Sequence, residues 1–562
     1  MSTDEPVTRR SLWESATFAP LHQRIYRAIW IASMVSNFGS LIQAVGAAWL
    51  MTSLAPGATM VALVQTSTAL SVMLLSLPAG AIADIWDRRR LMMLAQITML
   101  IVSIVLAVLT LLGRMTPWTL LSLTFLLGCG MAIYGPAWQS SVGEQVPRDQ
   151  IPAAVALNSL GYNFARTLGP ALGGAIVAAL GATAAFLVNA ASYVALIVVL
   201  AGWKRHQPTP ALPPESMTVA IKAGLRYARL APSIRAVLLR SLAFSAVGSA
   251  VWALMPVIAR DLVAGGALTY GILFGGFGGG AVLGALASTP LRQRLRNEVL
   301  VRTATLGFGV AVLVAGLSHW TLLTLLALIG AGAAWVIVLA TFTTLIQTAA
   351  PRWVVGRAMA IYQMAVFGGM ALGSWWWGLL AEQISARGSL LGSALGLGAA
   401  ALIGLRVAVP ESENANLDPS SSGASPQPRV ELDPESGPVV MTIEYRIAAV
   451  DREVFLSAMQ ELRRIRRRDG ARRWTLLQDI TEPERWLERF HNPSWLEYLR
   501  QHQRFTVDDR QAQLRVLALH RSAEAPVIRH YVVRVPSTGV GEIGVLDPNL
   551  PGTPAPLASR RE

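Results

Sequence analysis

The sequence has few charged residues and a single cysteine. Charged side chains make up 14% of the 562 residues, hydrophobic ones make up 53%, and the mean hydropathy is +0.47. This balance excludes a large soluble enzyme and indicates a protein with many membrane spans. The lone Cys129 excludes a disulfide within the chain, and its apolar surroundings indicate a buried small residue.

Two kinds of functional group are also missing. The sequence has no phosphate-binding loop of the Walker type, which argues against direct ATP hydrolysis. The predicted membrane core has no carboxylate, because Asp84, Glu144, Asp261 and Glu382 all lie near the ends of apolar runs. The residues alone therefore identify no proton carrier, and we predict neither a cofactor nor a metal site.

Positive charge is concentrated in the apolar part of the chain. Residues 1–410 contain 26 Lys and Arg against 11 Asp and Glu, whereas the remaining residues contain 21 against 22. Basic residues collect in the cytoplasmic loops of membrane proteins, and this topology explains the net charge of +14. We therefore predict a lipid bilayer, and no nucleic acid, as a partner.

Uncharged runs predict an all-α polytopic membrane protein with twelve spans. Each run is long enough to cross about 30 Å of hydrocarbon. Loops with Arg88–Arg90, Arg352 and Arg357 fall on one side, and those with Arg114 and Arg260 on the other, so both termini should be cytoplasmic. The predicted spans are 27–51, 60–83, 91–112, 117–142, 151–180, 182–203, 236–260, 267–288, 299–318, 320–347, 357–381 and 388–408.

The same patterns divide the chain into seven segments. Two six-helix bundles are expected, with a cytoplasmic linker between them and a soluble domain after them. The expected location is the cytoplasmic (inner) membrane of a bacterium. The segments are a cytoplasmic tail (1–26), the N-terminal bundle (27–203), the linker (204–235), the C-terminal bundle (236–409), a flexible linker (410–439), the soluble domain (440–536) and a disordered tail (537–562).

An internal repeat supports the two-bundle organisation. Three loci recur at one offset of 204 residues, and a shared offset is stronger than any single glycine match. It predicts a duplication of six plus six helices, with the substrate path between the halves. The repeated loci are Gly80–Asp84 with Gly284–Ser288, Pro147-Arg148 with Pro351-Arg352, and Gly169 and Gly174 with Gly373 and Gly378.

The loop after the second span is a candidate conformational latch. Gly80 permits close helix packing, Asp84 is an acceptor for the end of a facing helix, and Arg88 and Arg89 are partners for carboxylates. The alternative is a loop whose charge only fixes orientation. The spacing resembles the loop motif of the major facilitator superfamily, and the Leu-Pro-Ala-Gly80 lead-in resembles its enterobactin-exporter-like branch. Ile85 and Asp87 depart from that motif.

The fifth span contains a buried cation. Asn158, Tyr162 and Arg166 share one helix face, with Asn163 beside them, and Arg166 lies about 22 Å into the span. An arginine there costs about 2.5–3.5 kcal/mol, so it should face a cavity or a partner. Two interpretations remain open: contact with an anionic substrate, or a structural arginine bonded to carbonyl groups, water or polar side chains.

Further residues complete the predicted cavity. Gln43 is a polar candidate in the first span, and Tyr362 and Gln363 in the eleventh are the predicted partners of Arg166 across the cavity. The string Gly169-Pro170-Ala-Leu-Gly173-Gly174 resembles the fifth-helix motif of export-type members of the superfamily. That resemblance implies a helix bend, a bundle interface and export rather than uptake.

The part after 439 has the pattern of an α+β domain. Alternating residues predict strands and amphipathic runs predict helices. The pattern resembles the ferredoxin-like fold of antibiotic-biosynthesis-monooxygenase-type domains, which implies pairing into a homodimer. An arginine-rich strip at 463–473 is expected to be a solvated face, with anionic lipid as the alternative. The predicted strands are 440–447, 473–479, 485–490 and 527–533, and the predicted helices are 451–468, 494–502 and 508–519.

Three function classes follow. The favoured one is a secondary active transporter that exports a small organic compound, siderophore-like or drug-like, by alternating access, with proton coupling implied by the resemblance. The alternatives are a membrane-tethered sensor and a monooxygenase-like enzyme, each acting through the C-terminal domain. The resemblance favours a transporter and not an enzyme.

Overall fold

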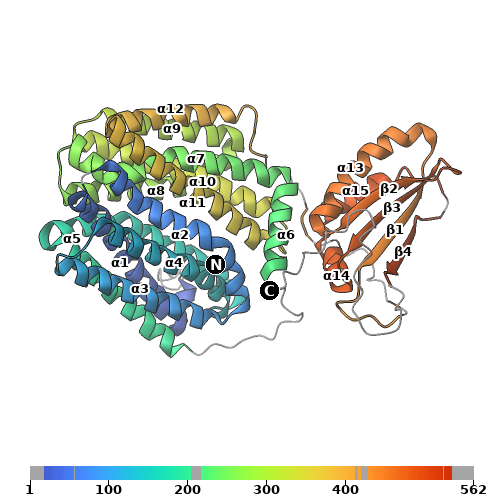
Figure 1. Ribbon diagram of the computed structural model, residues 1–562, viewed down its shortest axis with the longest axis horizontal. Coiled ribbons are helices and arrows are strands. Elements are labelled where there is room, and N and C mark those ends of the chain that lie inside the picture. Colours follow the sequence, from blue (N-terminus) through green and yellow to red (C-terminus); the bar gives the residue numbers. More distant parts are fainter. Residues whose placement is uncertain are drawn as a thin grey trace, which may run out of the picture. The chain divides into compact units, whose positions relative to one another are not determined.

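The computed structural model divides into two compact units, Met1–Leu417 and Asp418–Glu562. The first is a helical body and the second contains a small sheet with helices (Figure 1). Described residues are 18–55, 57–203, 217–411, 416–418, 420, 428, 430–522 and 524–534, without the side chains of Ala81, Ala83, Asp84, Ile85 and Arg148. The predicted tail 537–562 and most of the predicted tail 1–26 lie outside them.

Eleven of the described helices are long and apolar enough to cross a membrane. They form because uncharged runs satisfy their backbone polar groups within the helix, as a bilayer requires. These helices are α1 (Arg24–Leu54), α2 (Ala58–Ile85), α3 (Arg88–Leu111), α4 (Pro117–Ser141), α5 (Ile151–Gly202), α7 (Pro232–Val257), α8 (Ala267–Arg294), α9 (Asn297–Leu317), α10 (Thr321–Ala349), α11 (Val355–Gln383) and α12 (Ala386–Ile403).

The difference between twelve predicted spans and eleven helices lies in α5. This element has 52 residues and covers both the fifth and the sixth predicted spans. Its backbone is not helical at Gly181, where φ is 78° and ψ is 174°. A side chain would strain that conformation, which glycine adopts readily. The two halves of α5 therefore meet at a glycine break.

Two helix pairs make the largest contacts between the two halves of the body. α5 packs against α8, and α2 packs against α11. A Cβ atom built on Gly174 would lie 2.8 Å from the Cα atom of Gly271 and 2.7 Å from the carbonyl oxygen of Ala267. These backbones approach so closely because neither glycine has a side chain. Each pair joins a helix of one predicted bundle to a helix of the other.

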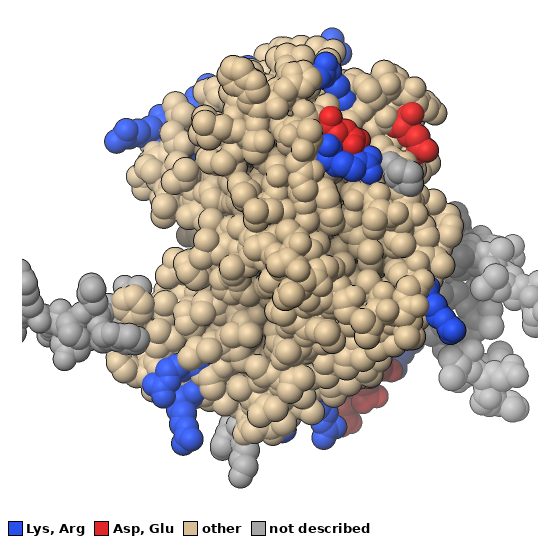
Figure 2. Space-filling model, turned by 90° about the vertical axis from the view of Figure 1, so that its left-hand side faces the viewer, with Lys and Arg blue, Asp and Glu red and all other residues tan. Residues whose placement is uncertain are grey.

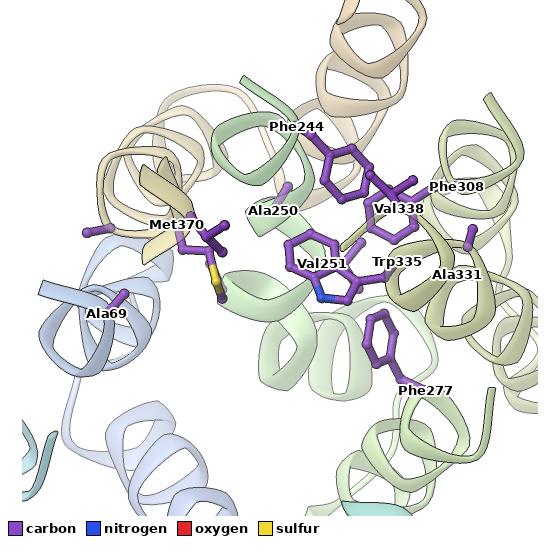
Figure 3. Packing of buried hydrophobic residues seen from close by; sticks show 14 of the residues in the cluster. Ala69, Phe244, Ala250, Val251, Phe277, Phe308, Ala331, Trp335, Val338 and Met370 are labelled. Carbon is purple, nitrogen blue, oxygen red and sulfur yellow. The ribbon is translucent and has the colours of Figure 1, made fainter. Parts of the chain in front are cut away.

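Aromatic side chains fill the core of the second bundle. Phe244, Phe308 and Trp335 project toward one another from α7, α9 and α10 (Figure 3). Ring centroids lie 5.0 Å apart for Phe244 and Trp335, and 5.6 Å apart for Phe308 and Trp335. Such tilted pairs stabilise a core beyond the area that they bury. Three helices are thereby fixed to one another.

A short helix, α6 (Met217–Leu230), lies within the predicted linker 204–235. It crosses the ends of the long helices (Figure 1). Its apolar face is buried: the Tyr227 hydroxyl donates to the Ala349 carbonyl at 3.3 Å, and Gly224 packs on Arg357. We call this end of the body the α6 end.

The second unit contains a four-stranded antiparallel sheet of order β2-β3-β1-β4. Tyr445, Phe455 and Trp486 form part of its core. Each of its main strands and helices begins and ends within two residues of the prediction. The elements are β1 (Val439–Arg446), α13 (Arg452–Asp469), β2 (Arg472–Gln478), β3 (Arg485–Asn492), α14 (Trp495–Arg504), α15 (Val507–Leu517) and β4 (Val527–Val532).

Candidate functional site

A large cavity lies between the two halves at the α6 end. Its volume is about 650 Å³, and both halves line it. Gln139 contributes from α4, Gln363 from α11, and Arg352, Trp353 and Arg357 from the region where α11 begins. Among the described lining residues, the only charged ones are the two arginines. The cavity wall therefore combines positive charge with amide groups and aromatic rings.

A smaller cavity of about 160 Å³ lies farther along the helices. Met131 lines both cavities, so the two are neighbours. Tyr162, Trp252 and Tyr270 line the smaller one from α5, α7 and α8, and Gln43 lines it from α1. Together the two cavities follow the boundary between the halves.

The end of the body opposite α6 is closed by contacts between the halves. Arg260 Nη1 donates to the Thr52 carbonyl at 3.3 Å, and the Thr59 hydroxyl donates to the Glu382 carboxylate. Figure 2 views the left-hand side of Figure 1 and shows closely packed uncharged residues at the centre, with a few charged residues near the edges. The larger cavity therefore lies on the α6 side of a closed barrier.

Arg166 contacts aromatic rings of the other half. Its guanidinium carbon lies 5.6 Å from the ring centroid of Trp252 and 6.0 Å from that of Phe277. Both distances are typical of cation–π attraction. Among the described residues no carboxylate forms an ion pair with it. Trp252 also lines the smaller cavity, so Arg166 lies beside a residue of its wall.

The predicted pairing of Tyr362 with Arg166 is not observed. The Tyr362 hydroxyl donates to the Leu339 carbonyl at 3.2 Å and lies 3.4 Å from the Thr343 hydroxyl, so it is turned toward α10. Gln363, the next residue, lines the larger cavity. Tyr362 and Gln363 are neighbours in one helix, and neighbouring positions differ by about 100° of rotation about the helix axis. One side chain therefore packs against α10, and the next lines the cavity.

Three other predicted cavity residues are held by hydrogen bonds. The Gln43 carbonyl oxygen accepts from Ser103 at 2.7 Å and from Asn189, which keeps Gln43 against the smaller cavity. Asn158 accepts from the Tyr26 hydroxyl at 3.1 Å, and Asn163 donates to the Ser159 carbonyl at 2.8 Å. Tyr162 is half exposed and lines the smaller cavity.

The predicted latch residues lie within the first half in this conformation. Arg88 Nη1 donates to Glu144 and to the Ser140 carbonyl, both at 2.8 Å. Arg89 donates to the last carbonyl groups of α5, at 2.7 Å each. Gly80 lines the larger cavity, and the side chain of Asp84 lies outside the described residues. A latch to the other half therefore stays a prediction.

The glycines of the fifth-helix motif face two different neighbours. A Cβ atom on Gly169 would lie 3.0 Å from Leu41 Cβ, and one on Gly173 would lie 3.0 Å from Ile42 Cα, both in α1. Gly174 instead faces α8, and Pro170 lies inside α5 between these contacts. One motif thus serves packing within the first half and contact with the second.

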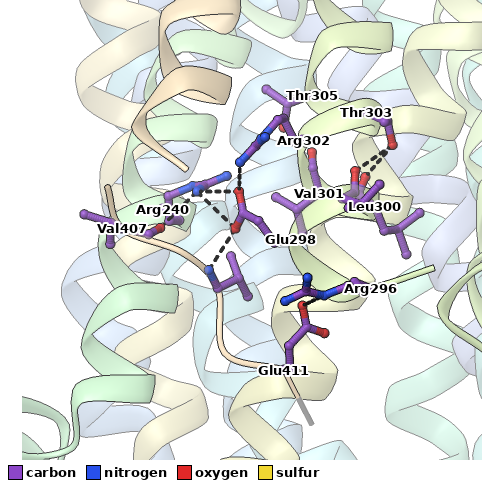
Figure 4. Close-up of polar contacts among 12 residues, drawn as sticks. Arg240, Arg296, Glu298, Leu300, Val301, Arg302, Thr303, Thr305, Val407 and Glu411 are labelled. Atoms are coloured by element: carbon purple, nitrogen blue, oxygen red, sulfur yellow. Dashed lines mark hydrogen bonds and ion pairs between the residues drawn. The ribbon is translucent and has the colours of Figure 1, made fainter. Parts of the chain in front are cut away.

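The sequence analysis did not predict a buried cluster of charged side chains around Glu298. Arg240, in α7, is 4% exposed, and its Nη1 lies 3.3 Å from Glu298 Oε1. Arg302 and the backbone N–H of Val409 also donate to Glu298, at 3.3 and 2.8 Å (Figure 4). The sequence contained one signal for this cluster, because Arg240 lies inside the predicted seventh span. The cluster joins α7, α9 and the segment after α12.

Residues 15–538 match the model of the family described as transmembrane secretion effector, MFS_3. The chain belongs to this family of major facilitator superfamily transporters. The match includes most of both units. The chain is thus a multi-pass membrane transporter with a small-molecule substrate, and its relatives are transporters rather than enzymes.

Two curated relatives are named for the compounds that they transport. The staphyloferrin A transporter of Staphylococcus aureus is 25% identical over 284 residues, which cover 50% of this chain and 71% of that protein. The enterobactin exporter EntS of Salmonella choleraesuis is 27% identical over 304 residues, which cover 52% and 70%. These identities are those of members of one family. The compound named for each relative is a statement about that relative and not about this chain.

Solved transporters share the fold of the helical body. A bacterial homolog of the human lysosomal transporter Spinster, inward-facing and unoccupied, matches with a TM-score of 0.55 and 13% identity over 69% of this chain and 96% of that chain. A POT family transporter in complex with 5-aminolevulinic acid matches with a TM-score of 0.57 and 13% identity over 69% and 97%. Both support the fold alone.

Proposed function

We propose that the protein is a secondary active transporter that exports a small, anionic, siderophore-like organic compound across a bacterial inner membrane. The observation that carries this proposal is the cavity of about 650 Å³ between the halves at the α6 end, together with the contacts that join the halves at the opposite end. A cavity between two bundles, reached from one side at a time, is how alternating access works. The proposal includes coupling to protons, which the resemblance to the family implies.

The α6 end is the cytoplasmic side in this proposal. Arg88, Arg352 and Arg357 lie toward it, and basic residues favour the cytoplasm. The chain then crosses the membrane twelve times, with α5 crossing twice about Gly181. A single helix of 52 residues would be about 78 Å long, far more than one bilayer crossing.

The charge of the cavity supports an anionic cargo. Arg352 and Arg357 line it, and Arg166 lies farther in, behind Trp252. Arginine binds carboxylates and phenolate oxygens through paired N–H groups. Trp353 supplies an aromatic surface beside the arginines. Siderophore-like compounds with catecholate oxygens have this chemistry, and the two relatives are named for the transport of staphyloferrin A and enterobactin.

Everted membrane vesicles test the proposal. We expect energised vesicles to accumulate a catecholate compound such as 2,3-dihydroxybenzoylserine, and Arg357→Gln to reduce this at least tenfold per folded molecule. The control is Arg294→Gln, a substitution at an exposed arginine at the end of α8. Equal losses of catecholate and of cationic-dye transport in Arg357→Gln would contradict the anionic cargo. No accumulation of either compound would contradict export.

We also propose that the C-terminal unit is ferredoxin-like and accessory to transport. The order β1-α13-β2-β3-α14-α15-β4, with β1 between β3 and β4, supports this fold. Pairing of two such domains into a homodimer belongs to the same proposal. Cross-linking of the full chain in membranes tests the pairing, and a protein that stays monomeric there contradicts it.

A further inference from the structure

The C-terminal unit contains a cavity of its own. Its volume is about 280 Å³, and it lies between the sheet and the helices, where α13, α14 and strands β1, β3 and β4 all contribute. This volume is near the lower end of small-molecule pockets, which run from about 300 to 1,000 Å³. It accommodates a compound with one aromatic ring.

The cavity contains an arginine with unused hydrogen-bond donors. Arg466 is 11% exposed, and its Nε and Nη2 atoms are buried without a hydrogen-bond partner among the described residues. These two donors share one edge of the guanidinium group, the edge that a carboxylate binds with both oxygens. Buried donors left without acceptors are costly, so this edge requires a partner.

Glu488 is the nearby carboxylate, and it is fully buried. Its Oε1 lies 3.5 Å from Arg466 Nε, which is an ion-pair distance without a hydrogen bond. The two carboxylate oxygens accept from Trp474 at 2.8 Å and from Tyr445 at 3.0 Å. Glu488 therefore balances one positive charge without a hydrogen bond to Arg466. Arg510 lines the same cavity and supplies a second positive charge.

Aromatic rings hold the guanidinium group in place and form the walls. Its carbon lies 5.2 Å from the ring centroid of Phe490 and 5.4 Å from that of Phe505, and both residues line the cavity. Tyr498 lines it too, and its hydroxyl lies 2.8 Å from His530 Nε2. Burial lowers the pKa of His530, with a further contribution from His502. Asp469 also lines the cavity and is paired with Arg468 at 2.9 Å, whereas Arg466 and Arg510 supply positive charge to the wall.

We propose that this cavity binds a small aromatic acid, with its carboxylate on the Nε and Nη2 edge of Arg466 and its ring among Phe490, Tyr498 and Phe505. The site is separate from the transport cavity, because each lies within its own compact unit. It gives the C-terminal unit a ligand-binding function that does not depend on the proposed export.

Photolabelling of the full chain in detergent tests this site. The probe is 4-azidosalicylate, and mass spectrometry locates the label. We expect label on peptides of 439–534, displaced by salicylate but not by the uncharged salicylamide at a tenfold higher concentration. Absence of label from these peptides, or equal displacement by acid and amide, would overturn the proposal. This comparison uses the wild-type chain and so does not depend on the folding of any variant.

Substitutions then identify the arginine. Arg466→Gln should lower labelling of 439–534 at least tenfold, and Arg466→Lys should lower it less, because lysine keeps the charge and loses the paired donors. Arg467→Gln is the matched control, since Arg467 is exposed on the same helix. Arg357→Gln, in the transport cavity, should leave this label unchanged. Wild-type labelling in a folded Arg466→Gln protein would overturn the proposal.

Discussion

Arg166 contacts Trp252 and Phe277 across the boundary between the halves of the body. Its helix position left two interpretations open, contact with an anionic substrate or a structural role, and its observed neighbours are rings. A cation–π contact is worth about 0.5–2 kcal/mol, and the upper value applies where water is excluded. We therefore predict two separable roles for this residue: it raises the electrostatic potential near the smaller cavity, and it joins the two halves through its ring contacts.

Substitution of Arg166 separates these roles. We expect Arg166→Lys to keep partial export of an anionic compound and Arg166→Met to reduce it at least tenfold, since only lysine keeps the charge. The measurement is export per folded molecule for an anionic and a cationic compound. Equal losses for both would contradict an anion-selecting role. If Arg166 acts through the ring of Trp252, the effects of Trp252→Leu and Arg166→Met on export should be non-additive in a double-mutant cycle.

Glu298 stabilises a buried arginine. Glu298→Gln removes the anion that faces Arg240, and a broken buried pair costs about 3–5 kcal/mol. We expect a clear fall in the melting temperature in detergent, reversed in part when Arg240→Leu is added. The exposed pair of Arg296 and Glu411 provides the control, because Glu411→Gln should cost about 0–1 kcal/mol. A neutral Glu298→Gln would show that the cluster does not support the fold.

At the scale of elements, the contact between α5 and α8 depends on glycine. Gly174 lies against Gly271, and no side chain separates the two backbones. The same two helices carry part of the internal repeat, so the close contact is a feature of how the halves are joined. In the proposed alternating access, the halves move relative to each other along this helix pair.

Gly174→Leu should separate α5 from α8. Overpacking at a close contact costs about 1–3 kcal/mol, and here it acts on the boundary between the halves. We expect export per folded molecule to fall at least tenfold. Gly307→Leu, in α9, is the matched control, because a Cβ atom there meets nothing within 4 Å. Equal activity of the two variants would show that the α5–α8 contact does not control transport.

At the scale of the whole molecule, the two units have separate cores. The helical body contains both halves of the repeat and the cavity between them, whereas the C-terminal unit has its own sheet and cavity. This division favours a body that transports by itself and a C-terminal unit that modulates it. A sensor or an enzyme would instead require the C-terminal unit for the main activity.

Truncation after Leu417 tests this division. We expect the shortened chain to insert normally and to retain at least a third of the wild-type export per folded molecule, because the body holds the whole proposed path. The control is full-length protein prepared in the same vesicles. A truncated protein that inserts normally and transports nothing would show that the C-terminal unit is required for transport.

Local patterns in the sequence determined the elements. Apolar runs marked the membrane helices, because a bilayer leaves an uncharged chain no other way to satisfy its backbone polar groups. Alternation and amphipathic spacing marked the strands and helices of the C-terminal unit to within two residues. Both signals are periodic and local, so they can be read from a single chain.

The tertiary structure alone decided which side chains meet. Tyr362 turns toward α10 while Gln363 faces the cavity, although both stood on the same predicted surface. Arg166 meets Trp252, 86 positions later in the chain, and Arg240 meets Glu298. The physical reason is that successive side chains of a helix point about 100° apart. If the predicted direction of a side chain is wrong by one position, its predicted partners are wrong too. The sequence determined a family of two-bundle transporters, and packing determined the residues that line the cavity.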